Sequence, residues 1–156
     1  MNAALQAELF QRYPKLFRKP GKRLFVPETG DDYLVESAGS IDVNGIECAD
    51  GWFAIVDRLS CACEREIESL EQQGVPAERW PRAAQIKEKL GTMRFYVFGP
   101  LSDALRELIG LEHSDGGESA RTCASCGGPR KPSAGSLLIT DCDDCASAQH
   151  SSGPKG

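Results

Sequence analysis

The sequence lacks two features that would direct the chain into a membrane or out of the cell. No apolar run approaches the roughly twenty residues that a membrane-spanning helix needs. Met1 leads into polar Asn2 and Gln6, and no apolar signal core follows it. We therefore expect a soluble, cytoplasmic protein. In a reducing cytoplasm its seven cysteines would stay out of structural disulfides.

Familiar catalytic motifs are also missing. The sequence contains no His-Glu-x-x-His, Gly-x-Ser-x-Gly or Gly-x-x-x-x-Gly-Lys pattern, and no His-x-Glu that would make its cysteines a deaminase site. It has only two histidines, His113 and His150. We therefore expect a protein that is not an enzyme. The alternative, an enzyme with a site of another type, would involve Glu88 or Asp50.

Two Cys-x-x-Cys pairs are the strongest signal in the sequence. A fifteen-residue spacer separates Cys123 and Cys126 from Cys142 and Cys145, and each pair can place two thiolates on one tetrahedral ion. The pattern predicts a zinc ribbon with structural Zn²⁺, because four thiolates leave no open position for catalysis. Two disulfides fit a reducing compartment poorly, and two thioredoxin-like redox motifs fit this spacing poorly. Since both pairs are complete, neither histidine is expected to bind the metal.

The hydrophobic content of 40% supports a real core, and the order of the patterns predicts an α+β fold. We expect residues 1–116 to form a small antiparallel sheet packed on one main helix. Residues 117–150 would then form the C-terminal four-cysteine zinc ribbon, and residues 151–156 a disordered tail.

The main helix is predicted over residues 51–73, with Asp50 as its cap and Gly74 just beyond its end. At about 100° per residue, its apolar face gathers Trp52, Ile55, Val56, Leu59, Cys63, Ile67 and Leu70. The opposite face carries an acidic stripe formed by Asp57, Glu64, Glu68 and Glu71. Such a stripe is usually a solvated face, and the alternative is a surface for a basic partner. Cys61 and Cys63 point about 160° apart, so we do not expect them to chelate a metal.

Shorter helices are predicted on either side of the main one. Apolar residues recur at helical spacing over residues 2–13, and Pro14 ends the pattern. The same spacing recurs over 103–113 after Ser102, which can cap the first turn. The residues expected to face inward there are Leu105, Leu108, Ile109 and Leu111. The polar, glycine-rich residues 113–119 are expected to form a hinge into the ribbon.

Two β-hairpins are predicted. Residues 41–43 and 46–48 alternate around Asn44-Gly45, a frequent type I′ turn. Residues 85–90 and 93–98 flank Gly91-Thr92, read as a type II′ turn that pairs Leu90 with Met93, Glu88 with Phe95 and Ile86 with Val97. One face of this second hairpin would be apolar and the other basic. A helix over 82–90 ended by Gly91 also fits the spacing. Leu24–Val26 is a further candidate strand.

Charge is unevenly distributed along the chain. Residues 1–26 carry six positive side chains and one negative, whereas residues 27–80 carry three positive and thirteen negative. The molecule should therefore present surfaces of opposite sign. The basic residues from Arg12 to Arg23 are interleaved with Tyr13 and Phe17, which suggests either nucleic-acid contact or a solvated loop anchored by its apolar residues.

Four segments resemble a family of small proteins encoded by phages, prophages and plasmids that carry a C-terminal zinc ribbon. The segments are Tyr13-Pro14-Lys15-Leu16-Phe17, Gly45-Ile46-Glu47-Cys48-Ala49-Asp50-Gly51-Trp52-Phe53, Gln85-Ile86-Lys87-Glu88-Lys89-Leu90-Gly91-Thr92-Met93-Arg94-Phe95-Tyr96 and Cys123-Ala124-Ser125-Cys126-Gly127. The resemblance covers most of the chain. It implies a protein that acts by binding, such as an inhibitor of CRISPR or another host defence, and it brings no site residues with it.

These observations predict a non-enzymatic zinc-binding protein that docks on a protein partner. A host complex that itself binds nucleic acid is a candidate for this partner, because such a complex would be basic and could dock on the acidic stripe. The candidate partner-binding residues are Asp57, Glu64, Glu68, Glu71, Trp80, Arg94 and Tyr96. The alternative is a zinc-ribbon protein that binds nucleic acid, for which the candidate residues are Arg18, Lys19, Lys22, Arg23, Arg130 and Lys131.

Overall fold

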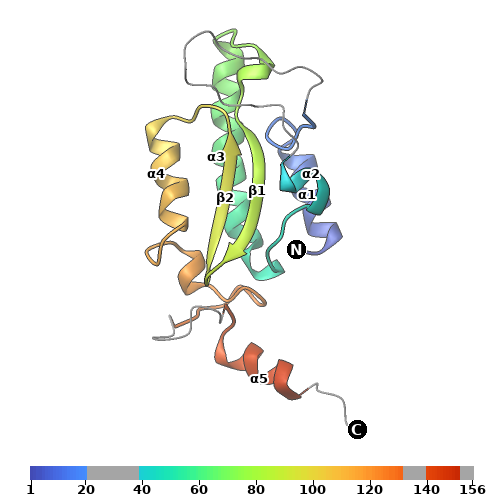
Figure 1. Cartoon of the computed structure of the whole chain (residues 1–156), viewed down its shortest axis with the longest axis vertical. Coiled ribbons are helices and arrows are strands. Elements are labelled where there is room, and N and C mark those ends of the chain that lie inside the picture. Colours follow the sequence, from blue (N-terminus) through green and yellow to red (C-terminus); the bar gives the residue numbers. More distant parts are fainter. Residues whose placement is uncertain (21–38, 132–139, 152–156) are drawn as a thin grey trace.

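The computed structural model describes residues 1–20, 39–131 and 140–151. Its elements are α1 (Ala3–Arg12), α2 (Ser40–Asn44), η1 (Asp50–Trp52), α3 (Phe53–Gln72), η2 (Ala77–Arg79), β1 (Arg82–Lys89), β2 (Thr92–Phe98), α4 (Asp103–Glu112), η3 (Ser119–Arg121) and α5 (Asp143–Ser151). The predicted α+β fold is confirmed. The antiparallel hairpin β1–β2 lies against α3, with α4 beside β2 and α2 beside β1 (Figure 1). The candidate strand Leu24–Val26 lies outside the described residues.

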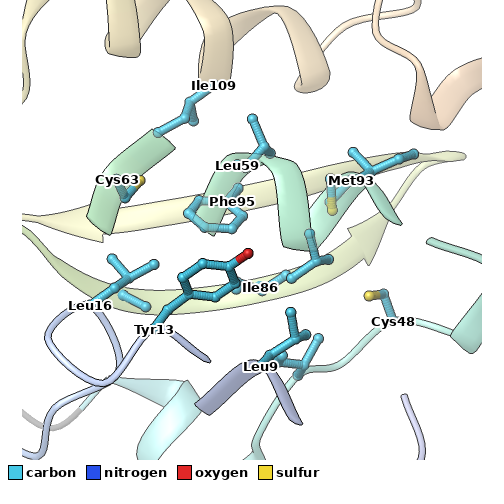
Figure 2. Packing of buried hydrophobic residues seen from close by; sticks show 14 of the residues in the cluster. Leu9, Tyr13, Leu16, Cys48, Leu59, Cys63, Ile86, Met93, Phe95 and Ile109 are labelled. Carbon is cyan, nitrogen blue, oxygen red and sulfur yellow. The ribbon is translucent and has the colours of Figure 1, made fainter. Parts of the chain in front are cut away.

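The core lies between α3 and the inner face of the hairpin. Ile86 and Phe95 meet Leu59 and Cys63 there, and residues of the N-terminal segment close the remaining side (Figure 2). The predicted apolar face of α3 is confirmed from Trp52 to Ile67, whereas Leu70 is only half-buried. Burial raises the pKa of the Cys63 thiol to about 12, so this cysteine behaves as a small apolar side chain.

The second hairpin forms as a hairpin and not as a helix, but its turn is Leu90-Gly91 instead of Gly91-Thr92. Both turn residues have positive φ, 53° at Leu90 and 79° at Gly91, as a type I′ turn requires. The register pairs Glu88 with Met93 and Ile86 with Phe95. Each partner is thus displaced by two residues from the prediction. Because side chains alternate with a period of two, the predicted apolar and basic faces are retained.

Both edges of this hairpin find hydrogen-bond partners. Beside β1, the Glu47 N–H donates to Ile86 O (2.8 Å), and Glu47 O accepts from the Glu88 N–H (3.1 Å). Beside β2, the Met93 N–H donates to Ser119 Oγ and the Phe95 N–H donates to His113 Nε2, both at 3.0 Å. Side chains from the region after α4 therefore satisfy amides that a third strand would otherwise pair.

The predicted first hairpin is wrong, because residues 40–44 form α2. The Asp42 carboxylate accepts the Gly39 N–H (2.7 Å), which caps this helix, and it also receives two contacts from Arg82 Nη1 at 2.9 and 3.1 Å. Gly45, with φ 68°, then ends the helix. Among the described residues, Glu47 forms a β-bridge, but its partner is Lys87 of β1, in parallel orientation, and not the predicted strand 41–43.

The start of α3 also differs from the prediction. Asp50 does not cap the helix. Its Oδ1 accepts the Asn2 N–H and its Oδ2 accepts Asn2 Nδ2, both at 2.7 Å. Asn2 in turn caps α1, because its Oδ1 accepts the Leu5 N–H at 3.0 Å. Asp50 therefore holds the beginning of α1 against the beginning of α3.

The predicted helix α4 is confirmed with Ser102 as its cap, since Ser102 Oγ accepts the Leu105 N–H at 3.4 Å. Leu111, expected to face inward, is 52% exposed. The expected hinge after this helix is instead tied down. Buried Glu112 binds Arg58 (3.0 Å) and accepts the Ser119 N–H (3.0 Å).

None of the helices among the described residues combines the length and the apolar character that crossing a membrane requires.

Candidate metal centre

Four sulfur atoms converge at the end of the core. The Sγ atoms of Cys123, Cys126, Cys142 and Cys145 all lie within 4.8 Å of one another. Cys126 Sγ and Cys142 Sγ, from different pairs, are 3.8 Å apart. Zn–S bonds of about 2.3 Å in a tetrahedron give S···S edges of about 3.8 Å. The cluster therefore has the size of a four-thiolate zinc site, and all seven cysteines are free thiols.

The first pair sits in a tight turn that packs directly on the start of α3. Gly127, with φ 73°, lets the chain reverse so that the Cys123 N–H reaches Gly128 O at 2.8 Å. The Gly51 N–H donates to Ala124 O (2.7 Å), and Trp52 Nε1 donates to Thr122 O (2.9 Å). We call residues 122–128 the metal turn. Two backbone-directed bonds therefore fix its position on the core.

Backbone amides point at the sulfur of Cys123. Its Sγ accepts the Cys142 N–H at 3.3 Å and the Cys126 N–H at 3.5 Å. Burial alone would raise the pKa of this thiol, but the amide donors outweigh burial and lower it to about 7. These donors thus favour the thiolate of Cys123, and the thiolate is the form of cysteine that binds metal.

The second pair lies at the beginning of α5. Cys142 precedes this helix and Cys145 lies in its first turn, where hydrogen bonds with the side chains of Cys142 and Cys126 raise the pKa of the Cys145 thiol. Asp141 connects the two pairs, because its Oδ1 accepts Ser125 Oγ (2.6 Å) and the Ser125 N–H (3.2 Å). Residues 132–139, the middle of the spacer, lie outside the described residues.

The four cysteine sulfurs are a donor set that fits zinc. His113 is engaged at another place in the fold. His113 Nε2 accepts the Phe95 N–H, so this histidine serves the hairpin edge. Four cysteine sulfurs suit Zn²⁺, a borderline-soft cation that thiolates bind well. The residues that could hold the ion are therefore the four predicted from the spacing.

The acidic stripe on α3 meets the chain's own N-terminal segment. Glu64, 7% exposed, accepts the amide N–H groups of Lys15 (3.1 Å) and Leu16 (2.8 Å). Asp57 pairs with Arg12 (2.7 Å), and Glu71 pairs with Lys15 Nζ (2.6 Å). Of the four predicted residues, only Glu68 is exposed and forms no ion pair within the described ranges. The stripe mainly anchors residues 12–16.

The remaining partner-binding candidates separate into two groups. Trp80 is half-buried, with Nε1 donating to Val75 O (2.8 Å) and the cations of Lys15 and Arg18 near its ring. Arg94 and Tyr96 lie on the other face of the hairpin, away from α3, and Tyr96 is 40% exposed.

The basic residues proposed for nucleic acid are likewise not one patch. Arg18 donates to four backbone carbonyls, those of Lys15, Ala77, Trp80 and Pro81, so it holds the N-terminal segment to the region before β1. Arg130 donates to Gly91 O and Ala120 O. Lys19 and Lys131 are exposed. Lys22 and Arg23 lie outside the described residues.

Sequence reasoning missed His113 as a structural residue. Its pKa is lowered, first by burial and then by the Arg94 charge, and Glu112 opposes this shift. Only the unprotonated Nε2 can accept the Phe95 N–H. A histidine with a lowered pKa gives no pattern in the sequence, because its partner is a backbone amide eighteen residues away.

Acidification is therefore expected to weaken the fold through His113. Because its pKa is lower in the folded protein than in the unfolded chain, the unfolded chain takes up the proton first. The stabilisation that unprotonated His113 provides is fully present above about pH 6.5. It is lost as the pH falls toward the lowered pKa of this histidine in the folded protein. Urea unfolding of His113→Gln, which cannot titrate, should show a smaller loss between about pH 7.5 and 5.5 than the wild type. An equal loss in both proteins would contradict this role.

Comparison of the chain with family models, with curated proteins and with solved structures found no match. The candidate site therefore rests on the sequence pattern and on the geometry described above.

Proposed function

We propose that the protein is a non-enzymatic zinc-binding protein. The metal would hold the C-terminal segment on the α+β core, and the assembled surface would bind a partner. One observation carries the first part of this proposal, namely the four Sγ atoms within 4.8 Å of one another at zinc-ribbon spacing. Four thiolates close the shell of a tetrahedral ion, so such a metal would stabilise and would not activate water.

The position of the metal turn supports a structural role. The turn contributes buried Cys123 and Ala124 to the protein interior, and it bonds to Gly51 and Trp52 at the start of α3. A metal that joins this turn to α5 would therefore couple the C-terminal segment to the core helix. Because an unfolded chain offers no preformed site, zinc binding would contribute directly to the folding free energy.

Zinc content tests this proposal. We expect one zinc ion per chain, measured by elemental analysis of protein purified without added metal. Cys126→Ser should lower zinc affinity by more than the roughly 10–100-fold that loss of an outer-shell partner costs. It should also lower the melting temperature, as a strong chelator should for the wild type.

Cys61→Ser is the matched control, because Cys61 lies on α3 and is not part of the cluster. This variant should keep both the zinc and the melting temperature. If the purified protein holds no zinc and chelation leaves its melting curve unchanged, the structural metal is excluded.

The finer part of the proposal is that the partner is a protein of a host defence system, and its support is the resemblance to proteins of phages and plasmids. In the structure, several residues of the segments that carry the resemblance make contacts between different elements of the fold. The Leu16 N–H donates to the Glu64 carboxylate, and the Gly51 N–H donates to Ala124 O of the metal turn. Ile86 and Phe95 lie on the inner face of the hairpin. The resemblance therefore supports a shared architecture more directly than a shared partner.

Glu68 offers a test of a protein partner at the acidic stripe. Because this side chain is exposed and does not anchor the N-terminal segment, Glu68→Lys should leave the fold intact. If a basic partner docks there, the substitution should slow its association most strongly at low salt. Unchanged binding to an identified partner would place the contact elsewhere.

A further inference from the structure

We propose that the outer face of the hairpin binds single-stranded nucleic acid. This face, which points away from α3, is defined by Lys87 and Lys89 of β1 and by Arg94 and Tyr96 of β2. The inference goes beyond zinc binding and names a second activity on a surface distinct from the metal centre.

The three cations of the outer face stand close together without ion-pair partners. Lys87 lies directly opposite Arg94 in the hairpin register, and Lys89 follows on the same side of β1. Like charges placed opposite each other on a sheet destabilise it. None of the three forms an ion pair within the described ranges, in contrast to Arg12, Lys15, Arg58 and Arg82. An external polyanion would relieve this repulsion.

Carboxylates near the outer face are engaged elsewhere. Glu47, at the edge of β1, accepts Ser40 Oγ (2.7 Å) and Gln85 Nε2 (3.2 Å), and the Lys87 charge helps to lower its pKa after these hydrogen bonds. Glu88 Oε1 accepts the Gly91 N–H in the turn (2.8 Å). The outer face therefore carries the three cations Lys87, Lys89 and Arg94, with the Glu47 carboxylate near Lys87 at its edge, in a protein whose net charge is −5.

An aromatic ring accompanies these charges. Tyr96 is 40% exposed, and its ring meets His113 edge-on with centroids 5.2 Å apart, which restricts its orientation. Proteins that bind single strands combine cations along the backbone with aromatic side chains on which bases stack. The outer face has both components on one rigid hairpin.

The surroundings leave this face open within the described part of the molecule. The inner face packs on α3, while α2 and α4 lie beside the two edges, so no labelled helix covers the near side of the sheet in Figure 1. The guanidinium of Arg94 donates to Thr92 Oγ1 and to Met93 O, contacts within its own strand that leave its charge uncompensated.

Single strands fit this face better than other anions. The hairpin is a two-stranded ribbon, but α2 and α4 flank its edges and hinder its entry into the groove of a duplex, and the bases of a duplex are stacked and unavailable to Tyr96. An acidic polypeptide would match the cations but would make no use of the exposed ring. The negative charge of the rest of the chain would limit non-specific binding to nucleic acid.

Fluorescence anisotropy with labelled DNA and RNA single strands of about 12 nucleotides tests the inference on the zinc-loaded protein. Three phosphate contacts predict a slope of log K against log salt near −2, so a rise from about 50 to 200 mM should weaken binding by roughly 20-fold. Lys87→Glu with Lys89→Glu should weaken it by at least about tenfold and move the slope toward −1. Tyr96→Leu should weaken it by about tenfold with an unchanged slope.

Arg65→Glu is the control for a single charge reversal, because it makes the charge change of one of the two lysine substitutions on an exposed position of α3 and should keep affinity close to that of the wild type. Zinc content and circular dichroism of each variant show whether its metal centre and fold are intact. The inference is overturned if the wild type does not bind at low salt, or if the hairpin variants bind as well as the wild type. It is also overturned if duplex or polyglutamate competes as well as the single strand at equal charge.

Discussion

Replacing Glu64 with alanine is expected to lower the free energy of unfolding by about 3 kcal/mol, because two amide donors in the turn after α1 lose their acceptor. The Glu64 carboxylate is 7% exposed and binds the N–H groups of Lys15 and Leu16. Leu16 is fully buried, and its carbonyl accepts the Ala83 N–H of β1 at 3.0 Å. A single side chain therefore joins the N-terminal segment, α3 and the hairpin.

Two further variants separate this role from a general charge effect. Glu68→Ala changes an exposed acidic position about one turn further along the same helix and should leave stability within about 0.5 kcal/mol of the wild type. Glu64→Gln keeps one acceptor oxygen, so its free energy of unfolding should fall by less than that of Glu64→Ala. The midpoint of urea unfolding measures all three. If Glu64→Ala and Glu68→Ala have the same midpoint, Glu64 does not anchor the segment.

Gly51→Ala is expected to displace the metal turn and to cost about 3 kcal/mol, near the upper end for overpacking. A Cβ at residue 51 would lie 2.4 Å from Cys123 O and from Gly127 N, and 2.6 Å from Ala124 O. These are backbone atoms, which cannot move aside as a flexible side chain would. The substitution should therefore lower both the melting temperature and the zinc affinity, although residue 51 is not a ligand.

Gly110→Ala provides the control for Gly51→Ala. Gly110 lies inside α4, and a Cβ there would meet nothing within 4 Å. Alanine is the better helix former, so this variant should gain roughly 0.5–1 kcal/mol and keep its zinc. Wild-type zinc affinity and stability in Gly51→Ala would show that the metal turn does not need its close contact with α3.

The features that the sequence predicted well are those set by local spacing. The four clustered cysteines that could hold a metal ion follow from two Cys-x-x-Cys pairs, and α1, α3 and α4 follow from apolar residues at helical intervals. The faces of the hairpin were predicted correctly because alternation survives a shift of two residues. The turn itself was misplaced because Leu90 takes a positive φ, a conformation that favours glycine and that no simple pattern assigns to leucine.

The features that the sequence did not predict depend on partners far along the chain. Asn44-Gly45 resembles a hairpin turn, but Arg82, forty residues from Asp42, helps hold this segment as α2. In the sequence, Glu64 looks like part of a solvated stripe. In the fold, its carboxylate accepts the N–H groups of Lys15 and Leu16, which lie forty-nine and forty-eight positions earlier in the chain. Such pairings need the assembled fold, because no local pattern distinguishes a solvated carboxylate from one that binds buried amides.

The covered edges of the hairpin limit how the molecule can meet others. A two-stranded sheet with open edges can recruit a further strand, either from a peptide or from a second copy of itself, and can start aggregation in this way. Here Glu47 occupies part of one edge, while Ser119 and His113 occupy two amides of the other. Strand addition is therefore blocked at these positions, and a molecule that binds the hairpin must be recognised by side chains on the face of the sheet.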